Sequence, residues 1–319
     1  MDTVDKKSLT ERDICTKYIT PALVQAGWDL HSQIREQVNI TRGRVLVKGT
    51  AVTRATPKFA DYILYYSSNL PLAVVEAKDN NHSIGAGMQQ ALGYANMMDI
   101  PFVFSSNGDG FLLHDRSGNY EPMEREFTLG EFPTPAELWR RYRAWKGLDD
   151  KKEKIVTQNY YLDELGKVPR YYQMNAINRT VEAIANGQNR ILLVMATGTG
   201  KTYTAFQIIW RLWKSGVKKR ILFLADRNIL VDQTKTNDFK PFGSVMTKIT
   251  NRQVEKSYEI YLSLYQAVSG NEEERNIYKQ FSPDFFDLIS LTNATGGARR
   301  MTRCGGRFSI ISRMQPTSA

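Results

Sequence analysis

Cysteine and histidine are scarce in this 319-residue chain, which has two cysteines and three histidines. Cys15 and Cys304 cannot build a disulfide framework or a cysteine-rich zinc site, and the scattered histidines add no ligand spacing. We therefore expect no structural metal centre.

Long apolar runs are also missing. The longest strongly apolar stretch is Ile191–Ala196, whereas a membrane span needs about 20 apolar residues. Met1–Asp13 alternates charge and polarity and has no apolar signal core. With 42% hydrophobic and 24% charged residues, the chain is expected to be globular, cytoplasmic and without a membrane partner.

Positive charge is in excess, with a net charge of +10 and a pI near 9.4. Clustered Lys and Arg gain affinity for phosphates by releasing counterions, so a polyanion partner is favoured. Many basic proteins bind no nucleic acid, however, and charge alone leaves the matter open.

The first half of the chain is predicted to be α/β. Apolar residues at helical spacing predict two helices, and runs rich in β-branched and aromatic residues predict three strands. The helices are expected over 11–26, ending at Gly27, and 84–98; the strands over 60–66, 72–78 and 101–105. Ser67-Ser68-Asn69 suits the turn of a hairpin within a mixed sheet, and Asn107-Gly108 suits another turn.

The second half follows the strand-helix-strand order of a parallel-sheet nucleotide-binding domain. The almost wholly charged run Asp149–Lys154 most simply marks a solvated connection, and we place a boundary there. Beyond it we expect a helix over 172–186, a buried strand over 190–196, a helix over 201–214 and a strand over 220–225.

The turn after the predicted strand has phosphate-loop chemistry. It reads Ala196-Thr197-Gly198-Thr199-Gly200-Lys201-Thr202. The glycines let backbone N–H groups cradle phosphates, Lys201 supplies a point charge, and the Thr202 hydroxyl can ligate Mg²⁺. The generic phosphate-loop pattern fails, because Met195 stands where it requires glycine. The alternative is a turn rich in glycine and threonine that binds no nucleotide.

The same loop resembles motif I of superfamily-two helicases and translocases, in which that first glycine is not required. Gln173 resembles the glutamine with which the family reads adenine. Phe223–Arg227 and Leu230–Gln233 resemble motif Ia. The resemblance implies ATP as the ligand, with Gln173 and the loop residues Thr197, Gly198, Thr199, Gly200, Lys201 and Thr202 binding it.

A second constellation lies in the first half. The two-residue period of a strand places Glu76 and Lys78 on one face, and Asp61 on the neighbouring predicted strand can bring a second carboxylate beside Glu76. Asp61 and Glu76 can bind Mg²⁺, which polarises a phosphodiester and activates water, while Lys78 stabilises negative charge. By itself, Glu-x-Lys is a weak signal, because an exposed strand commonly carries this pair as a solvated salt bridge.

Gln90 and Tyr94 lie on one helical face by their spacing and suit a contact with backbone phosphate. The set resembles the restriction-endonuclease-like (PD-ExK) domain of type I restriction subunits. Asp61, Glu76 and Lys78 match the catalytic triplet, and Gln90 and Tyr94 match its accessory motif. Glu11 resembles the acidic residue on the family's first helix, although a first-turn acid favoured by the helix dipole is an equal alternative.

The order of these motifs resembles the restriction (R) subunit of type I restriction-modification enzymes over residues 9–289. The resemblance implies Mg²⁺-dependent cleavage of unmethylated double-stranded DNA, coupled to ATP-driven translocation. It also implies methyltransferase and specificity subunits as partners. The alternatives are a non-catalytic DNA- or ATP-binding fragment and a stand-alone ATPase.

The resemblance breaks after Phe286–Ile289, where the family's Asp-Glu-x-His box is absent. Back-translation of 291–296, read one base out of frame with suitable wobble bases, gives Asp-Glu-Cys-His-Arg. The same shift through Arg300–Phe308 gives Asp-Asp-Ala-Met-Trp-Arg-Glu-Ile. We therefore hypothesise a frameshift near 289–291 that removes ATPase and translocase activity and leaves a tail that is poorly ordered.

Together these features predict an α/β chain with four segments. They are a PD-ExK-like mixed-sheet nuclease domain over 1–148, a charged linker over 149–165, an incomplete RecA-like P-loop domain with a parallel sheet over 166–291, and an out-of-frame tail over 292–319.

Overall fold

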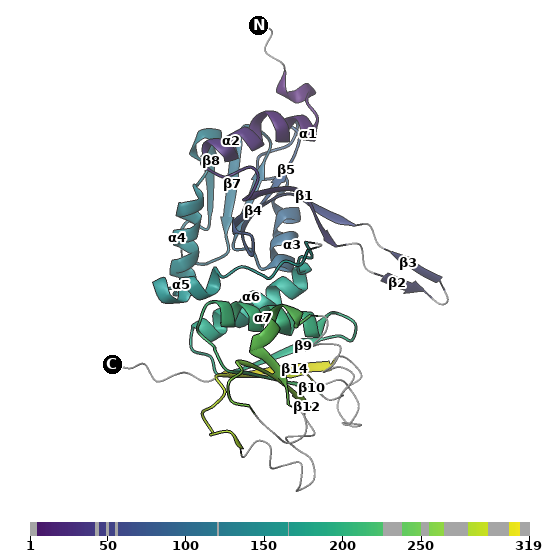
Figure 1. Ribbon diagram of the computed structural model, residues 1–319. Helices are drawn as coiled ribbons and strands as arrows, with labels where there is room; N and C mark the ends of the chain where they lie inside the picture. Colours follow the sequence, from purple (N-terminus) through teal and green to yellow (C-terminus); the bar gives the residue numbers. More distant parts are fainter. Residues whose placement is uncertain are drawn as a thin grey trace. The chain divides into compact units, whose positions relative to one another are not determined.

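The computed structural model describes residues 5–41, 45–48, 51–54, 57–119, 121–164, 166–225, 238–249, 255–264, 280–292 and 306–312. The chain divides into two compact units, Met1–Asp149 and Asp150–Ala319. Both combine helices with a six-stranded sheet, so the predicted α/β class is confirmed (Figure 1). No helix within the described ranges is long and apolar enough to cross a membrane.

The first unit is built on a mixed sheet with the strand order β1-β4-β5-β6-β7-β8. Only the β5–β6 pair is parallel among these neighbours; the others are antiparallel. A short ribbon, β2 with β3, separates β1 from β4 along the chain. The strands are β1 (Ile34–Thr41), β2 (Val45–Lys48), β3 (Ala51–Arg54), β4 (Lys58–Ser67), β5 (Leu70–Ala77), β6 (Phe102–Ser106), β7 (Gly110–Asp115) and β8 (Glu124–Thr128).

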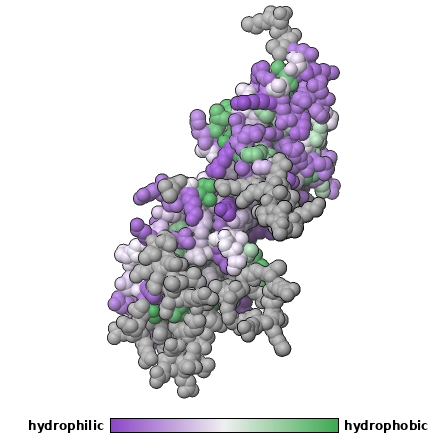
Figure 2. Space-filling view, turned by 90° about the vertical axis from the view of Figure 1, so that its right-hand side faces the viewer, coloured by the Kyte–Doolittle hydropathy of each residue, from purple (hydrophilic) through white to green (hydrophobic). Residues whose placement is uncertain are grey.

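Helices pack on this sheet where the topology requires them. A parallel pair needs a crossover, and α3 (Met88–Met98) supplies it by packing on both β5 and β6. α4 (Pro135–Lys146) contacts β5; it begins at the Thr134 cap and ends at Gly147, which has φ +62°. Short 3₁₀ turns lie at η1 (Lys6–Ser8) and η3 (Leu129–Glu131). In the view of Figure 2, this unit shows a mostly hydrophilic surface with small separate apolar patches.

The local predictions for the first half hold with small shifts. The helix expected over 11–26 is continuous but has a π-helical middle, and it ends at Gly27 with φ +92°. Its parts are α1 (Glu11–Ile14), η2 (Cys15–Ile19) and α2 (Thr20–Gln25). The predicted hairpin is β4–β5, and the strand expected over 101–105 is β6. The helix expected from Ile84 begins four residues later, at Met88, after a series of turns.

The second unit has the strand order β11-β12-β10-β13-β14-β9. The pairs β11–β12, β12–β10 and β10–β13 are parallel, whereas β14 is antiparallel to both of its neighbours. The strands are β9 (Arg190–Met195), β10 (Ile221–Ala225), β11 (Met246–Lys248), β12 (Ile260–Leu264), β13 (Leu288–Thr292) and β14 (Gly306–Ser312); the helices are α5 (Asp150–Val156), α6 (Tyr171–Ala185), α7 (Lys201–Lys214) and the 3₁₀ segment η4 (Lys240–Val245). Because two antiparallel steps separate β9 from β13, β9 runs in the direction of β10, as the strand-helix-strand pattern predicted.

Three expectations for the second half are wrong. The charged run at the boundary is not a simple connection, because α5 forms there. Asp150 and Glu153 in its first turn and Lys154 in its last turn suit the helix dipole, and Val156 is buried. The strand at 190–196 is not buried as expected, because β9 is the edge of the sheet and exposes Leu192 by 55% and Val194 by 64%.

The third correction concerns part of the tail, which was expected to be poorly ordered over 292–319; residues 293–305 and 313–319 lie outside the described residues. Gly306–Ser312 instead forms β14 inside the sheet, between β13 and β9. Phe308 and Ile310–Ile311 are strong strand formers, and Ile310 is only 1% exposed. A short apolar segment can therefore fill this position in the sheet.

Candidate functional site

Asp61 is held firmly on β4. It is 8% exposed, and both carboxylate oxygens accept hydrogen bonds. The backbone N–H of Ala77 donates to Oδ2 at 2.9 Å, and the side-chain Nε2 of Gln37 donates to Oδ1 at 2.9 Å. One donor comes from each neighbouring strand, so the sheet itself fixes the orientation of this carboxylate.

Glu76 lies beside Asp61 because β4 and β5 are paired. Tyr62 is opposite Val75 in that register, which makes Asp61 and Glu76 the next pair along the strands. Glu76 is 1% exposed, and its Oε2 has no hydrogen-bond partner among the described residues. Burial, followed by the nearby charge of Asp61, raises the pKa of Glu76 to about 8.

Lys78 follows directly after β5 and joins two carboxylates. Its Nζ is 3.5 Å from Oε1 of Glu76 and 3.5 Å from Oε2 of Glu11, and it donates to the carbonyl oxygen of Ala77 at 2.8 Å. Burial alone would lower the pKa of Lys78, but Glu76, Glu11 and Asp61 outweigh burial and leave that pKa raised. The ammonium group is therefore kept charged.

Glu11 reaches this cluster from the first helix. A capping box between Thr10 and Asp13 starts α1 and places Glu11 in its first turn. Glu11 is thus a first-turn acid and also an ion-pair partner of Lys78, while its match to the family's acidic residue stays a prediction. Its side chain stays 46% exposed.

Gln90 and Tyr94 come from α3 and contact each other, with Gln90 Nε2 donating to Tyr94 Oη at 2.9 Å. Burial raises the pKa of Tyr94, and the charges of Glu76 and Asp61 raise it further. The crossover helix thus carries this pair within electrostatic range of the two carboxylates. All six residues predicted for this site are brought together by the first unit.

Three further residues that the sequence analysis did not select complete the surroundings. Gln37 binds Asp61 as described, while Gly87 and Ser105 lie against Glu76. A Cβ on Gly87 would come within 3.0 Å of both Glu76 Cγ and Ser105 Oγ, and the Gly87 N–H donates to Ser105 Oγ at 3.0 Å. Ser105 is opposite Glu76 in the β5–β6 register. These contacts depend on strand pairing and have no signal in the sequence.

The donor set suits a hard divalent cation bound by few protein ligands. In the part of the chain that the structure describes, no group of three or more His, Cys, Asp or Glu side chains could hold a metal ion. Mg²⁺ is commonly bound by one or two carboxylates together with water and substrate phosphate. Two adjacent carboxylates, one with a buried oxygen that lacks a partner, fit that requirement.

The phosphate loop lies at the N-terminus of α7 in the second unit. Gly198 and Gly200 have φ of +77° and +82°, which only glycine adopts readily, and α7 begins at Lys201. Lys201 Nζ donates to the carbonyl oxygens of Met195 at 3.4 Å and Ala196 at 3.2 Å. Thr197 is exposed in the loop, and Thr202 lies in the first turn of the helix.

Gln173 is brought against this loop from α6. Its Nε2 donates to the Thr199 carbonyl oxygen at 2.8 Å, while its Oε1 accepts from the Arg170 N–H at 2.9 Å. A Cβ on Gly200 would lie 2.4 Å from Gln173 Nε2, so this approach requires glycine. In the segment resembling motif Ia, residues 223–225 belong to β10, and residues 226–233 lie outside the described residues.

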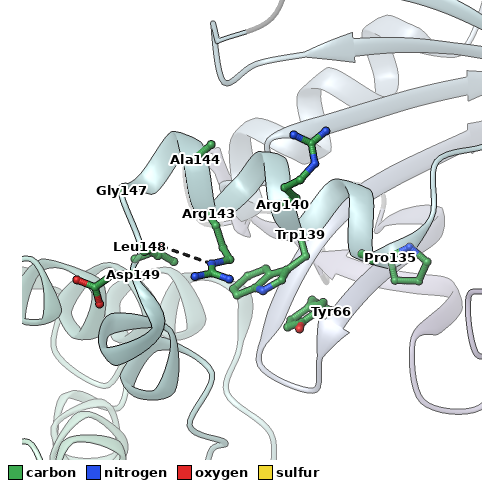
Figure 3. Close-up of a pocket in the computed structure, with 10 residues that line it drawn as sticks. Tyr66, Pro135, Trp139, Arg140, Arg143, Ala144, Gly147, Leu148 and Asp149 are labelled. Carbon is green, nitrogen blue, oxygen red and sulfur yellow. Dashed lines mark hydrogen bonds between the residues drawn. The ribbon is translucent and has the colours of Figure 1, made fainter.

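A cavity of about 740 Å³ lies elsewhere in the first unit (Figure 3). Trp139 of α4 stacks on Tyr66 with ring centroids 4.0 Å apart, and Arg140 and Arg143 also line the cavity. Arg143 Nε donates to the Leu148 carbonyl oxygen at 3.4 Å. None of the predicted site residues lines this cavity.

The model of the family described as "Type III restriction enzyme, res subunit" matches residues 166–290. The match covers β9, the phosphate loop, α7 and β10. The phosphate loop and this match indicate the class of protein. It is a restriction-enzyme subunit whose second unit is helicase-like and binds nucleotide.

Comparisons with individual proteins narrow that class to one family. The chain is 56% identical over 299 residues to the endonuclease subunit of the type I restriction enzyme EcoAI from Escherichia coli, covering 93% of this chain and 37% of that protein. It is 30% identical over 264 residues to the EcoKI endonuclease subunit from Escherichia coli K12, covering 66% and 22%.

A solved fragment described as an HsdR subunit of a type I restriction enzyme from Vibrio vulnificus is 42% identical. The match has a TM-score of 0.74 and covers 88% of this chain and 50% of the fragment. The chain belongs to the family of type I restriction enzyme R subunits, of which it matches the N-terminal part. It spans well under half the length of these two curated relatives.

Proposed function

We propose that the first unit is a PD-ExK-type nuclease that cleaves DNA with Mg²⁺. The observation that carries this proposal is the buried Oε2 of Glu76, which lacks a partner beside Asp61 and within reach of Lys78. Burying a carboxylate oxygen without a hydrogen-bond partner is costly, and Lys78 reaches only the other oxygen, Oε1. A bound cation would remove that cost.

In this proposal Asp61 and Glu76 hold the cation, and Lys78 supplies positive charge beside them. When bound, Mg²⁺ polarises the scissile phosphodiester and lowers the pKa of an attacking water. Ala77 and Gln37 keep Asp61 in place through its two oxygens. Glu11 also holds Lys78 through their ion pair.

Gln90 and Tyr94 are proposed to contact the DNA backbone. Gln90 is exposed on α3 and is already joined to Tyr94 by a hydrogen bond. An amide and a phenol hydroxyl both donate to phosphate oxygens without reading base sequence. This contact would position the strand rather than select a site, consistent with recognition by another subunit.

Nicking of supercoiled plasmid DNA tests the nuclease. We expect Mg²⁺-dependent nicking that Glu76→Ala and Lys78→Ala each abolish. The matched controls are Glu126→Ala on exposed β8 and Lys17→Ala, which removes only an exposed ion pair with Asp13. Nicking that survives in both site variants would overturn the proposal and favour a non-catalytic DNA-binding fragment.

The second unit is proposed to be an incomplete RecA-like domain that binds ATP without hydrolysing it efficiently. Lys201 and Thr202 begin α7 behind a glycine loop, and Gln173 lies against that loop. The acidic box that would bind Mg²⁺ and activate water is absent after β13. We expect nucleotide binding that Lys201→Ala weakens, with little phosphate release. If the wild type releases phosphate rapidly and Lys201→Ala does not, the proposal of inefficient hydrolysis is wrong and a stand-alone ATPase is favoured.

The absent box is proposed to result from a frameshift near residues 289–291. The family model stops matching at residue 290, where the shifted reading begins to restore Asp-Glu-Cys-His-Arg. Sequencing the gene decides this point. Codons that give no family-like text in the shifted frame would exclude the frameshift.

We further propose that the chain acts on unmethylated foreign DNA in the cytoplasm, together with methyltransferase and specificity subunits. The relatives are named as endonuclease subunits, which is what supports partner subunits for this chain. Co-expression with these subunits from the same locus, followed by affinity purification, tests assembly. Recovery of the chain alone would show that this N-terminal part does not assemble.

A further inference from the structure

Gln37 combines an uncommon backbone conformation with a position at the proposed cation site. Its φ is +48°, and it is one of two non-glycine residues with positive φ in the described ranges, the other being Asp99 at a helix end. Left-handed conformations favour Gly, Asn or Asp, because larger side chains crowd the backbone. A glutamine inside a strand is therefore an unusual occupant.

The strand register places Gln37 directly opposite Asp61. Glu36 pairs with Tyr62 and Val38 pairs with Ala60, so Gln37 and Asp61 lie opposite each other between these two pairs. The Gln37 Nε2 group donates to Asp61 Oδ1 at 2.9 Å, and its residue is otherwise exposed. The side chain contributes little to the core, whereas its amide restrains a carboxylate of the site.

The two hydrogen bonds of Asp61 have different origins. Ala77 donates through its backbone, which any residue at that position would do. Gln37 donates through a side chain, so this restraint on Oδ1 depends on the residue type. A carboxylate oxygen has two lone pairs, and one donor still leaves the other free for a cation.

We propose that Gln37 is a positioning residue for the cation site, holding Asp61 Oδ1 in the orientation that binds a divalent cation. This inference rests on the proposed function, because it assumes that Asp61 is a cation ligand. Side chains that orient metal ligands typically contribute roughly 10- to 100-fold to metal affinity. In this interpretation, the unfavourable backbone conformation of Gln37 is retained because it places the side-chain amide against Asp61.

Mn²⁺ binding to the full chain, measured by isothermal titration calorimetry, tests this inference. Gln37→Asn suits the left-handed backbone but is one methylene too short to reach Asp61. We expect it to weaken Mn²⁺ binding by roughly 10-fold or more, while the melting temperature without metal stays at or above that of the wild type. A merely structural role would lower the melting temperature and leave Mn²⁺ affinity unchanged.

Two controls separate the possible failures. Gln33→Asn removes a comparable side-chain hydrogen bond, to the Tyr66 carbonyl oxygen outside the site, and should leave Mn²⁺ affinity unchanged. Gln37→Met keeps the length of the side chain without the donor and should repeat the loss seen in Gln37→Asn.

Asp61→Asn establishes whether the site binds metal at all. If the wild type and Asp61→Asn bind Mn²⁺ equally, the proposed function fails. If Asp61→Asn loses Mn²⁺ binding while Gln37→Asn and Gln37→Met keep wild-type affinity, the proposed function stands and the role of Gln37 is overturned.

Discussion

At the scale of single residues, the buried carboxyl of Glu76 is suited to binding a cation but lowers the stability of the metal-free fold. Its carboxyl is 1% exposed, lies beside Asp61 and has one oxygen without a hydrogen-bond partner among the described residues. Lys78 offsets only part of the cost at 3.5 Å. Such a group should destabilise the metal-free fold whenever it is ionised.

The sign of the resulting pH dependence follows from the raised pKa of Glu76, about 8 against an ordinary value of 4.5. Between these values the folded chain keeps a proton that the unfolded chain releases, so stability falls as pH rises through this window. Glu76→Gln should remove this decrease in the free energy of unfolding, which is at most about 1.4 kcal/mol per pH unit. Urea unfolding at pH 5 to 8 without metal measures it, and parallel curves for both proteins would contradict the account.

Gly87 offers a second test at this scale. A methyl group there would meet Glu76 Cγ and Ser105 Oγ at 3.0 Å, so Gly87→Ala should displace Glu76. We expect weaker Mn²⁺ binding and a destabilisation of roughly 1 to 3 kcal/mol. Gly93→Ala on α3 is the matched control, because nothing lies within 4 Å of its Cβ position. Equal Mn²⁺ affinity in both variants would show that Gly87 does not control Glu76.

Asp61, Glu76 and Lys78 could be selected from the sequence, because alternation along one strand puts two of them on a face, a hairpin brings in the third, and the set resembles the family's catalytic triplet. Gln37 could not be selected in this way. Its role depends on the β1–β4 register and on a positive φ, and neither is written in a local pattern.

At the scale of elements, the sequence predicts the bounds of a helix or strand best where characteristic residues stand at both of its ends. The helix α7 was predicted at its observed bounds, because Gly200 precedes it and Ser215-Gly216 follows it. α5 was missed because its charges suit both a solvated connection and a helix. The exposure of β9 depends on which strand lies at the sheet edge, which local hydrophobicity does not determine.

The position of β14 leads to a prediction at this scale. Ile310 is 1% exposed in a strand that joins β13 to β9, so Ile310→Asp should bury an unpaired charge in the sheet. We expect a loss of on the order of 4 kcal/mol in the stability of the second unit. Val168→Asp, at a site 55% exposed in the same unit, is the control. If Ile310→Asp is as stable as Val168→Asp, β14 does not belong to the folded sheet.

At the scale of the whole molecule, the proposed cation site and the proposed nucleotide site lie in different compact units. The carboxylate cluster lies within residues 1–149, and the phosphate loop lies within residues 150–319. A ligand that binds only the folded state raises the melting temperature by an amount that grows with the logarithm of its concentration divided by its dissociation constant. Glu76→Ala should therefore remove the shift caused by Mn²⁺ but keep the shift caused by a non-hydrolysable ATP analogue.

The reciprocal variant completes this prediction. Lys201→Ala should remove the shift caused by the nucleotide analogue and keep the one caused by Mn²⁺, because Lys201 belongs to the other unit. Differential scanning fluorimetry of both variants measures the four shifts. Loss of both shifts in either single variant would contradict two independent sites.

If Asp61 and Glu76 share a divalent cation, anomalous diffraction from crystals of the chain containing Mn²⁺ will locate it. We expect an anomalous peak coordinated by carboxylate oxygens of both residues, with Oε2 of Glu76 among the ligands. A peak coordinated by other residues, or no peak beside Asp61 and Glu76 at Mn²⁺ concentrations that support DNA nicking, would contradict it.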